Sequence, residues 1–214
     1  INMDTVNLKQ YMDTVYMNSK PNAYHHGNLR AELLNAAMDI LDESGIEAVT
    51  IRQVARKAGV GHSAPANHFA GKRALLTQLA INIFINLGDT VKKELEAAPQ
   101  GLSEKISVFT DTLVTFGLGQ PNRYRLMWRR DYLDNDNKEL NSAMDVIYDE
   151  LLATLATGKE SRVSVESKAI ALWSMLQGYV SMRIDGNLEP KKDEVSGKDR
   201  QQAIVDVLLH GLIN

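Results

Sequence analysis

Apolar residues recur every three or four positions along almost the whole chain, which is the spacing of amphipathic helices. Alternating apolar and polar runs, the pattern of half-buried strands, are missing from the sequence. Glycine, proline and short polar runs interrupt the helical pattern and set the expected boundaries. The expected helices cover residues 4–18, 28–45, 50–59, 61–68, 72–97, 102–117, 122–130, 138–157, 165–185 and 198–213. The pattern therefore predicts an all-α fold.

Two of the short helices form a unit of their own within residues 50–69. Thr50 and Gln53 have the spacing of a helix capping box. Ala55 is the small residue expected where two helices cross, and Gly59 suits the bend between them. The side chains expected to face the preceding helix are Val54, Val60 and Phe69. This arrangement is typical of a helix-turn-helix, whose second helix enters the major groove of DNA.

The charges are segregated along the chain. The whole sequence has 24 basic and 27 acidic residues, a net charge of −3, which excludes binding of nucleic acid or membranes by overall positive charge. No Asp or Glu occurs between Ala48 and Gly88, where the five cations are Arg52, Arg56, Lys57, Lys72 and Arg73. The remainder carries 19 basic against 27 acidic residues, a charge of −8. Lys72 and Arg73 oppose the dipole of the helix they begin, at a cost of about 0.3–1 kcal/mol, so this end is predicted to face a phosphate.

Composition narrows the class of protein. With 214 residues, 44% hydrophobic and 24% charged, the chain is long and apolar enough for a folded core. The absence of cysteine excludes a disulfide scaffold, a thiol nucleophile, an iron–sulfur cluster and a cysteine-ligated zinc site. No apolar run approaches about 18 residues, and residues 1–20 lack the basic-then-apolar order of a signal peptide. We therefore expect a cytoplasmic protein with no membrane-spanning segment.

Enzyme motifs are incomplete in this sequence. Residues 61–65 begin like a nucleophile elbow but lack its second glycine and preceding strand, and residues 117–119 lack the third glycine of a dinucleotide-binding loop. The histidines that could be considered as metal ligands do not share a helical face: His25, His26, His62 and His68. We expect neither a cofactor nor a metal, and we expect that the protein is not an enzyme.

Several motifs of the N-terminal part occur together in one known family. They are Tyr24-His-His-Gly-Asn-Leu-Arg30, Leu34, Ala37, the run from Thr50 to Phe69, and Lys72-x-x-Leu75. Residues 24–76 thereby closely resemble the DNA-binding domain of the tetracycline-repressor (TetR) family of bacterial regulators. The resemblance implies that the residues facing DNA are Thr50, Arg52, His62, Ser63, Ala64, Ala66, Asn67, His68 and Lys72. The resemblance also matches Lys72 with the family's phosphate-contacting lysine. The alternative interpretation of Thr50 is that it serves only as a helix cap.

Ala66 departs from the family pattern. It stands where family members usually carry an aromatic residue, most often tyrosine, that contacts the phosphate backbone. We expect this change to weaken or redirect DNA binding, while Asn67 could read an adenine edge and His62 a phosphate or base. The alternative function is a helical protein-interaction module whose DNA binding is weakened or lost.

The last two helices are apolar on two sides. One stripe of the helix over 165–185 contains Leu172, Met175, Tyr179 and Met182, and the other contains Ile170, Trp173, Leu176, Val180 and Ile184. A helix with two apolar sides is buried on two sides, so these helices are predicted to pair with their symmetry mates in a four-helix interface. The candidate interface residues are Leu172, Met175, Met182, Ile204, Val207, Leu208 and Gly211.

The body also resembles one branch of the TetR family. The markers are Gln120-Pro-Asn-Arg-Tyr-Arg-Leu-Met-Trp128 and Leu172-Trp173-x-x-x-Gln177-Gly178, although the branch usually has Trp followed by His-Gly and Gln177 replaces that His. This resemblance implies a C-terminal dimerisation and effector domain. The candidate pocket residues are Met127, Trp128, Met144, Tyr148, Trp173, Gln177 and Tyr179, each of which is alternatively ordinary core. Arg183 lines the pocket, forms a salt bridge near Asp185, or is solvated.

The sequence therefore predicts three regions. Residues 1–20 form an N-terminal extension with a short amphipathic helix, residues 21–76 a three-helix helix-turn-helix DNA-binding domain, and residues 77–214 a helical bundle for effector binding and dimerisation. The function predicted is that of a transcriptional regulator, a ligand-responsive repressor that binds a palindromic operator as a homodimer. Its partners are then double-stranded DNA, a small-molecule effector and a second copy of the chain.

Overall fold

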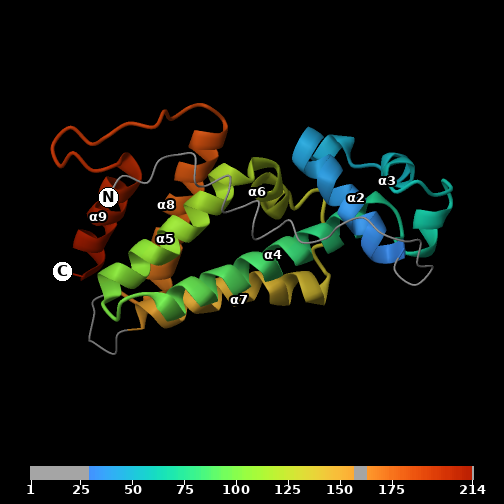
Figure 1. Cartoon of the computed structure of the whole chain (residues 1–214). Coiled ribbons are helices and arrows are strands. Elements are labelled where there is room, and N and C mark those ends of the chain that lie inside the picture. The colour runs from blue at the N-terminus through green and yellow to red at the C-terminus, as the bar shows by residue number, and fades with distance from the viewer. Residues whose placement is uncertain (1–28, 157–162, 214) are drawn as a thin grey trace.

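The computed structural model describes residues 29–156 and 163–213, and within these ranges it contains eight α-helices, two 3₁₀-helices and no strand (Figure 1). The α-helices are α2 (Leu29–Ser44), α3 (Ile51–Lys57), α4 (Lys72–Ala97), α5 (Leu102–Gly119), α6 (Pro121–Trp128), α7 (Lys138–Leu155), α8 (Val165–Ile184) and α9 (Arg200–Ile213). The 3₁₀-helices are η1 (Ile46–Ala48) and η2 (Ala64–Asn67). The all-α prediction is confirmed, while the predicted extension over 1–20, its helix, His25 and His26 lie outside the described residues.

Helix α4 is the axis of the molecule. Its 26 residues pack on α7 and α5 along their length and on α6 and α2 near its start (Figure 1). Within the described ranges it is the one helix long and apolar enough to cross a membrane, but 61% of its most apolar window is buried in the protein. Its apolar composition is therefore accounted for by its central position in the core. The same helix crosses the boundary predicted between residues 76 and 77.

The small N-terminal unit is built as the sequence pattern indicates. Leu33, Leu41 and Val54 are fully buried between α2 and α3, and Ala55 is fully buried as expected of a residue at a helix crossing. Gly59 has a φ of 69°, a left-handed conformation that suits glycine at the bend after α3. This unit lies at one end of the molecule (Figure 1).

The second helix of the predicted helix-turn-helix is shorter than expected. A helix was predicted over 61–68, whereas only η2 is helical and it has 3₁₀ geometry. Pro65 explains the difference, because it has no N–H to donate to the carbonyl of Gly61 as an α-helix requires. The backbone instead makes shorter-range bonds, from Ala64 N to Gly61 O at 3.0 Å and from Ala66 N to Ser63 O at 3.1 Å.

The body packs α5 and α7 against α4, α8 against α5 and α7, and α9 against α5 (Figure 1). Gly117 lets α5 approach α8 and α6 closely, because a Cβ atom there would lie 2.5 Å from Val180 Cγ1 on α8 and 3.1 Å from Tyr124 Cδ2 on α6. Gln201 Nε2 donates to Asp111 Oδ1 at 2.6 Å and so holds α9 on α5. Burial raises the pKa of Asp111, while this hydrogen bond acts in the opposite sense.

Candidate nucleic-acid interface and effector cavity

Helix α3 begins on a side-chain cap and presents cations to solvent. The Thr50 hydroxyl accepts a hydrogen bond from Gln53 N at 3.2 Å, which is one half of the predicted capping box. Arg52 and Arg56 are exposed on the side of α3 opposite the buried Val54. Neither arginine forms an ion pair with any residue that the structure describes. Both are therefore free to meet an external anion.

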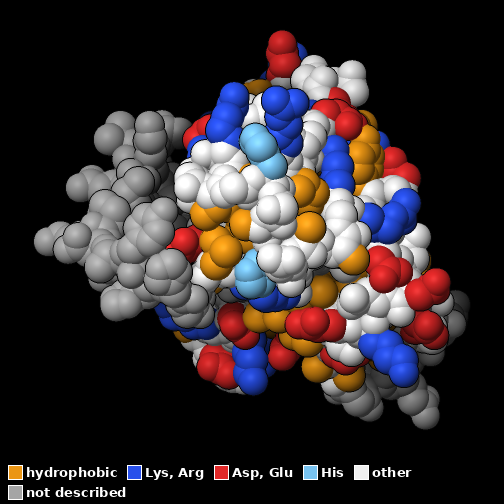
Figure 2. Space-filling model, turned by 90° about the vertical axis from the view of Figure 1, so that its right-hand side faces the viewer, with side chains coloured by type: hydrophobic (Ala, Val, Ile, Leu, Met, Phe, Trp, Pro, Cys, Tyr) orange, Lys and Arg blue, Asp and Glu red, His pale blue; other side chains and the backbone are white. Residues whose placement is uncertain are grey.

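The segment after α3 presents polar side chains at the same end of the molecule. His62, Ser63, Ala66, Asn67 and His68 are exposed, while Ala64 is half-buried. Figure 2 views this end and shows histidine among polar and hydrophobic groups on the face, with Lys and Arg along its upper edge and also at its right and lower sides. Over residues 29–156 and 163–213, no group of three His, Asp or Glu side chains is arranged to hold a metal ion.

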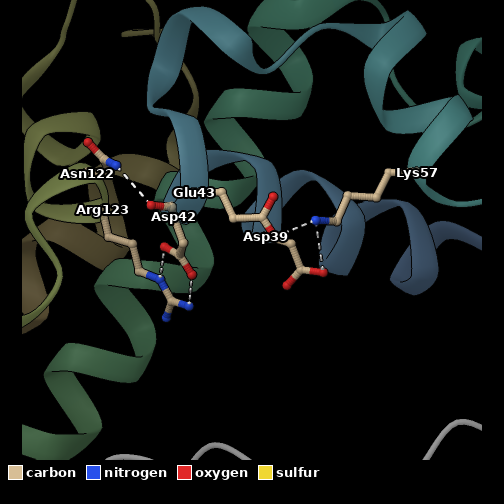
Figure 3. Close-up of polar contacts among 6 residues, drawn as sticks. All are labelled: Asp39, Asp42, Glu43, Lys57, Asn122 and Arg123. Atoms are coloured by element: carbon tan, nitrogen blue, oxygen red, sulfur yellow. Dashed lines mark hydrogen bonds and ion pairs between the residues drawn. The ribbon is translucent and has the colours of Figure 1, made fainter. Parts of the chain in front are cut away.

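The acidic side of α2 holds α3 in place. Lys57 Nζ lies 2.8 Å from Glu43 Oε1 and 3.8 Å from Asp39 Oδ2 (Figure 3). The hydrogen bond that Lys57 donates to Glu43 raises the pKa of Lys57. Lys57 is one of the five cations in the acid-free segment of the sequence, but the structure pairs it with carboxylates of α2.

Lys72 lies at the start of α4 and contacts Glu47 of η1. Its Nζ is 3.4 Å from the Glu47 carbonyl and 3.8 Å from the Glu47 carboxylate. It also lies 5.4 Å from the ring centre of Tyr132, whose hydroxyl donates a hydrogen bond to the Glu47 carboxylate. The lysine side chain is 31% exposed, so its ammonium is accessible but already shared with a carboxylate.

Arg73 differs from the expectation that it faces a phosphate. Its guanidinium donates to the carbonyls of Leu133 at 2.6 Å and Asp131 at 3.1 Å. The loop after α6 therefore takes up this cation, and Thr77 adds a bond in the same place by accepting from Asp134 N at 2.9 Å. The beginning of α4 is thus joined to the body of the protein.

A second junction links α6 to α2. Arg123 binds both carboxylate oxygens of Asp42, at 2.8 Å from Nε and 2.6 Å from NH2 (Figure 3). Asn122 Nδ2 donates to the Asp42 carbonyl at 3.0 Å, at the C-terminal end of α2. The Arg123 and Asp42 side chains are only 21% and 38% exposed, so this two-pronged pair is better shielded than an ordinary surface pair.

We expect Arg123→Gln to lower the free energy of unfolding by about 1–2 kcal/mol, because it leaves Asp42 without its charged partner. The matched control is Arg125→Gln, whose partner Asp185 lies at 2.8 Å but whose pair is 45% and 53% exposed. The control is expected to cost less than about 0.5 kcal/mol. Urea unfolding followed by circular dichroism measures both, and equal losses would contradict the role assigned to the shielded pair.

A small apolar cavity lies among the middle helices. It has a volume of about 20 Å³ and is lined by Leu87, Leu113, Tyr124, Met127, Trp128, Ile147, Trp173, Leu176, Gln177 and Val180. Four of the seven candidate pocket residues line it: Met127, Trp128, Trp173 and Gln177. Tyr148 does not line the cavity, but its ring centre lies 6.3 Å from that of Trp173, which does. The cavity as it stands has room for little more than one water molecule.

The remaining two candidates lie elsewhere. The sulfur of Met144 accepts a hydrogen bond from Arg130 NH1 at 3.2 Å. Tyr179 is buried on another side of α8, where its hydroxyl accepts a hydrogen bond from Arg183 NH1 at 2.9 Å. Sequence reasoning missed Tyr124 as a cavity residue, because the apolar pattern does not distinguish a tyrosine that lines a cavity from one that is packed in the core. Arg183 neither pairs with Asp185, which binds Arg125, nor lines the apolar cavity.

Three aromatic rings from α6 and α8 form part of the cavity wall. The ring centre of Trp128 lies 5.8 Å from that of Trp173 and 6.1 Å from that of Tyr124, both edge to face. Trp128 Nε1 is buried and has no hydrogen-bond partner among the described residues. Burial raises the pKa of Tyr124 to about 12, while the indole N–H of Trp128, close to the Tyr124 hydroxyl but without the geometry of a hydrogen bond, acts in the opposite sense.

Beyond these two rings lies an open groove of about 260 Å³. Tyr124 and Trp128 line both the inner cavity and this groove, so they form the partition between them. Arg125, Arg129 and Asp185 lie at the rim of the groove. A molecule entering from outside would therefore have to displace side chains of α6.

The candidate dimer residues differ in how exposed the structure leaves them. Leu172 is fully buried in the core of its own chain, so its side chain is not accessible to a second protomer. Met175 and Ile204 are half-buried, whereas Met182 is 45% and Val207 72% exposed. The structure does not describe the surroundings of Leu208 and Gly211.

Comparison with known proteins places these features in one class. The profile described as "Bacterial regulatory proteins, tetR family" matches residues 33–79, and that described as "Tetracyclin repressor-like, C-terminal domain" matches residues 107–212. The transcriptional regulator BetI of Escherichia coli is 36% identical over 76 residues, which are 36% of this chain and 39% of BetI. The chain thus matches well under half the length of these curated relatives.

Solved structures share the fold. A protein of unknown function from Rhodococcus sp. RHA1 has a TM-score of 0.77 and 26% identity, over 91% of this chain and all of that one. The regulator FadR of Bacillus subtilis, solved with stearoyl-CoA, has a TM-score of 0.63 at 14% identity, over 86% and 97% of the two chains. The class defined by fold and site is that of all-α helix-turn-helix regulators. Within it, the chain belongs to the TetR family of bacterial transcriptional regulators.

Proposed function

We propose that this protein is a ligand-responsive transcriptional repressor that binds a palindromic DNA operator as a homodimer. The observation that carries the proposal is the exposed end of the helix-turn-helix unit, where Arg52 and Arg56 are unpaired within the described chain. We propose that the residues in contact with DNA are Thr50, Arg52, His62, Ser63, Ala64, Ala66, Asn67, His68 and Lys72. Such a regulator acts in the cytoplasm, on the chromosome.

Footprinting on the DNA that flanks its gene tests this function. Two recognition segments related by a twofold axis should protect half-sites about 34–36 Å apart, or a multiple of that distance. A near-palindromic protected region is the expected result. Lack of protection at low salt would overturn the proposal, because low salt strengthens phosphate contacts.

Glu47 limits the contribution of Lys72 to DNA binding, because its carboxylate lies 3.8 Å from the ammonium that would meet a phosphate. We expect Glu47→Gln to tighten operator binding about 3- to 10-fold by removing this local negative charge. The matched control is Glu96→Gln, an exposed position near the far end of α4. Fluorescence anisotropy with labelled operator measures both, and equal affinities for the two variants would contradict this role of Glu47.

The effector site of the proposal is the apolar cavity between α6 and α8. A wall of aromatic and aliphatic side chains fits an apolar ligand. The buried, unpartnered Trp128 Nε1 adds a donor for one acceptor atom of that ligand, since an unpaired N–H in such a site is costly. Because the cavity is about 20 Å³, binding requires Tyr124 and Trp128 to move, and the adjoining groove gives the ligand its route in.

Movement of α6 would reach the DNA-binding unit by two routes. Asn122 and Arg123 at its beginning bind Asp42 of α2. At its end, Arg129 follows Trp128 directly and lies 4.4 Å from the ring of Tyr132, which contacts Glu47 and Lys72. An effector that favours a displaced α6 therefore disfavours the arrangement that binds DNA, by its difference in affinity for the two states.

A further inference from the structure

A second, larger cleft lies at the opposite end of the molecule from the helix-turn-helix unit (Figure 1). It has a volume of about 420 Å³ and is formed by the end of α8, the segment over 186–199 and the start of α9. The charged residues that line it are Arg183, Lys191, Lys192, Arg200 and Asp199. Four cations thus share one cleft with a single carboxylate, in a chain whose net charge is −3.

Backbone pairing places three of these cations together. The segment folds back on itself, with Arg200 N donating to the Lys191 carbonyl at 3.0 Å and an antiparallel bridge between Lys192 and Asp199. Asp193 N donates to the Lys198 carbonyl at 2.8 Å and closes the turn. The two arms therefore present their side chains from a fixed frame rather than from a free loop.

The fourth cation, Arg183, is positioned by a hydrogen bond to Tyr179 of the same helix. Arg183 is half-buried, and its NH1 donates to the hydroxyl of Tyr179, one turn earlier on α8, at 2.9 Å. Tyr179 is itself only 5% exposed, so it fixes the direction of the guanidinium. The other N–H groups of Arg183 remain available to a ligand, because a guanidinium has five.

Three carboxylates near the cleft, Asp185, Asp193 and Asp206, already have partners. Asp185 pairs with Arg125 at 2.8 Å, and Asp206 pairs with Lys198 at 2.6 Å. Asp193 accepts from Ser196 N and Ser196 Oγ, both at 2.7 Å, and these bonds lower its pKa. Among the described residues, no carboxylate lies within ion-pair distance of the four cations that line the cleft.

We infer that this cleft binds a small molecule carrying a diphosphate or two closely spaced phosphate groups. Two arginines offer planar forks that bind phosphate oxygens in pairs, and two lysines add mobile positive charge. The four cations outnumber the one carboxylate that lines the cleft, Asp199, and a polyanion relieves their mutual repulsion. DNA bound at the helix-turn-helix end does not reach the cleft, so the cations serve a separate ligand (Figure 1).

Calorimetric titration of the full chain with inorganic pyrophosphate, without DNA or effector, tests this inference separately from the proposed function. We expect saturable binding that Arg183→Gln/Arg200→Gln weakens at least tenfold. Lys191→Gln/Lys192→Gln provides a second variant on the exposed arm, with the same expected direction. The matched control is Lys92→Gln/Lys93→Gln, two exposed lysines on α4 outside the cleft, which should bind as the unaltered protein does.

Three results would overturn the inference. They are the absence of saturable binding to the unaltered protein, equal weakening by the cleft and control variants, and binding of citrate as tight as that of pyrophosphate at matched ionic strength. The first two exclude a site at the cleft, and the third excludes phosphate as the recognised group. Circular dichroism confirms that the variants compared are folded.

Discussion

Replacing Arg52 and Lys72 together with alanine should weaken operator binding by at least about 100-fold, because a dimer loses four charged contacts to DNA. Each contact of a cation with a phosphate contributes on the order of 1 kcal/mol or more at moderate salt. Arg52 is exposed and unpaired within the described chain, and Lys72 is partly exposed at the start of α4. Gel-shift titration at several salt concentrations measures the loss and should also show a shallower dependence on salt.

The control for this experiment removes the same number of charges elsewhere. Lys92 and Lys93 are exposed on α4, toward the end remote from the helix-turn-helix unit, so their replacement by alanine leaves the proposed interface intact. Operator affinity should then change by less than about threefold, since only the overall charge is altered. Indistinguishable DNA binding by both double variants, or none even in the unaltered protein, would favour a helical protein-interaction module.

Helix positions could be predicted because periodicity and end signals are local. The predicted helix over 72–97 coincides with α4, and the one over 165–185 differs from α8 by a single residue. The segment over 61–68 could not be treated the same way, because Pro65 removes a bond that periodicity does not report. The short η1 also has no periodic signal, since three residues do not complete an amphipathic turn.

The candidate site was less predictable because its partners are distant in sequence. Arg73 and Lys57 were recognisable as cations, but their partners come from the loop after α6 and from α2. Counting charges along the sequence predicts that such cations bind an external anion, because the count does not include partners that the fold brings from distant segments. The reverse holds for Arg183 and Arg200, which are unremarkable in a segment of mixed charge and become neighbours only through the turn over 191–200.

The dimer face shows a related limit. Periodicity correctly indicates that α8 is apolar on more than one side, but it does not say which stripe the protomer uses for itself. Leu172 and Leu176 are buried within the chain. The face left outward contains residues three or four positions apart, namely Ala171, Ser174, Gly178 and Met182. We therefore propose that this face of α8, with Val207 of α9, meets its symmetry mate.

Gly178→Arg should separate the dimer and thereby abolish operator binding. Two arginines facing each other across a twofold axis would bring like charges and added volume into the proposed interface, so we expect the dimer dissociation constant to rise at least about 100-fold. The fold of the protomer should survive, since a Cβ at Gly178 meets nothing within 4 Å. The helix itself gains about 0.5–1 kcal/mol when arginine replaces glycine.

Sedimentation velocity measures the dissociation, and gel shift measures its consequence for the operator. The matched control is Gly119→Arg, because Gly119 is exposed at the end of α5 and a Cβ there also meets nothing within 4 Å. The control should remain dimeric and bind DNA normally. If Gly178→Arg also remained dimeric, the outward face of α8 would not be the interface. A monomer that still bound the operator with full affinity would show that two linked half-sites are not required.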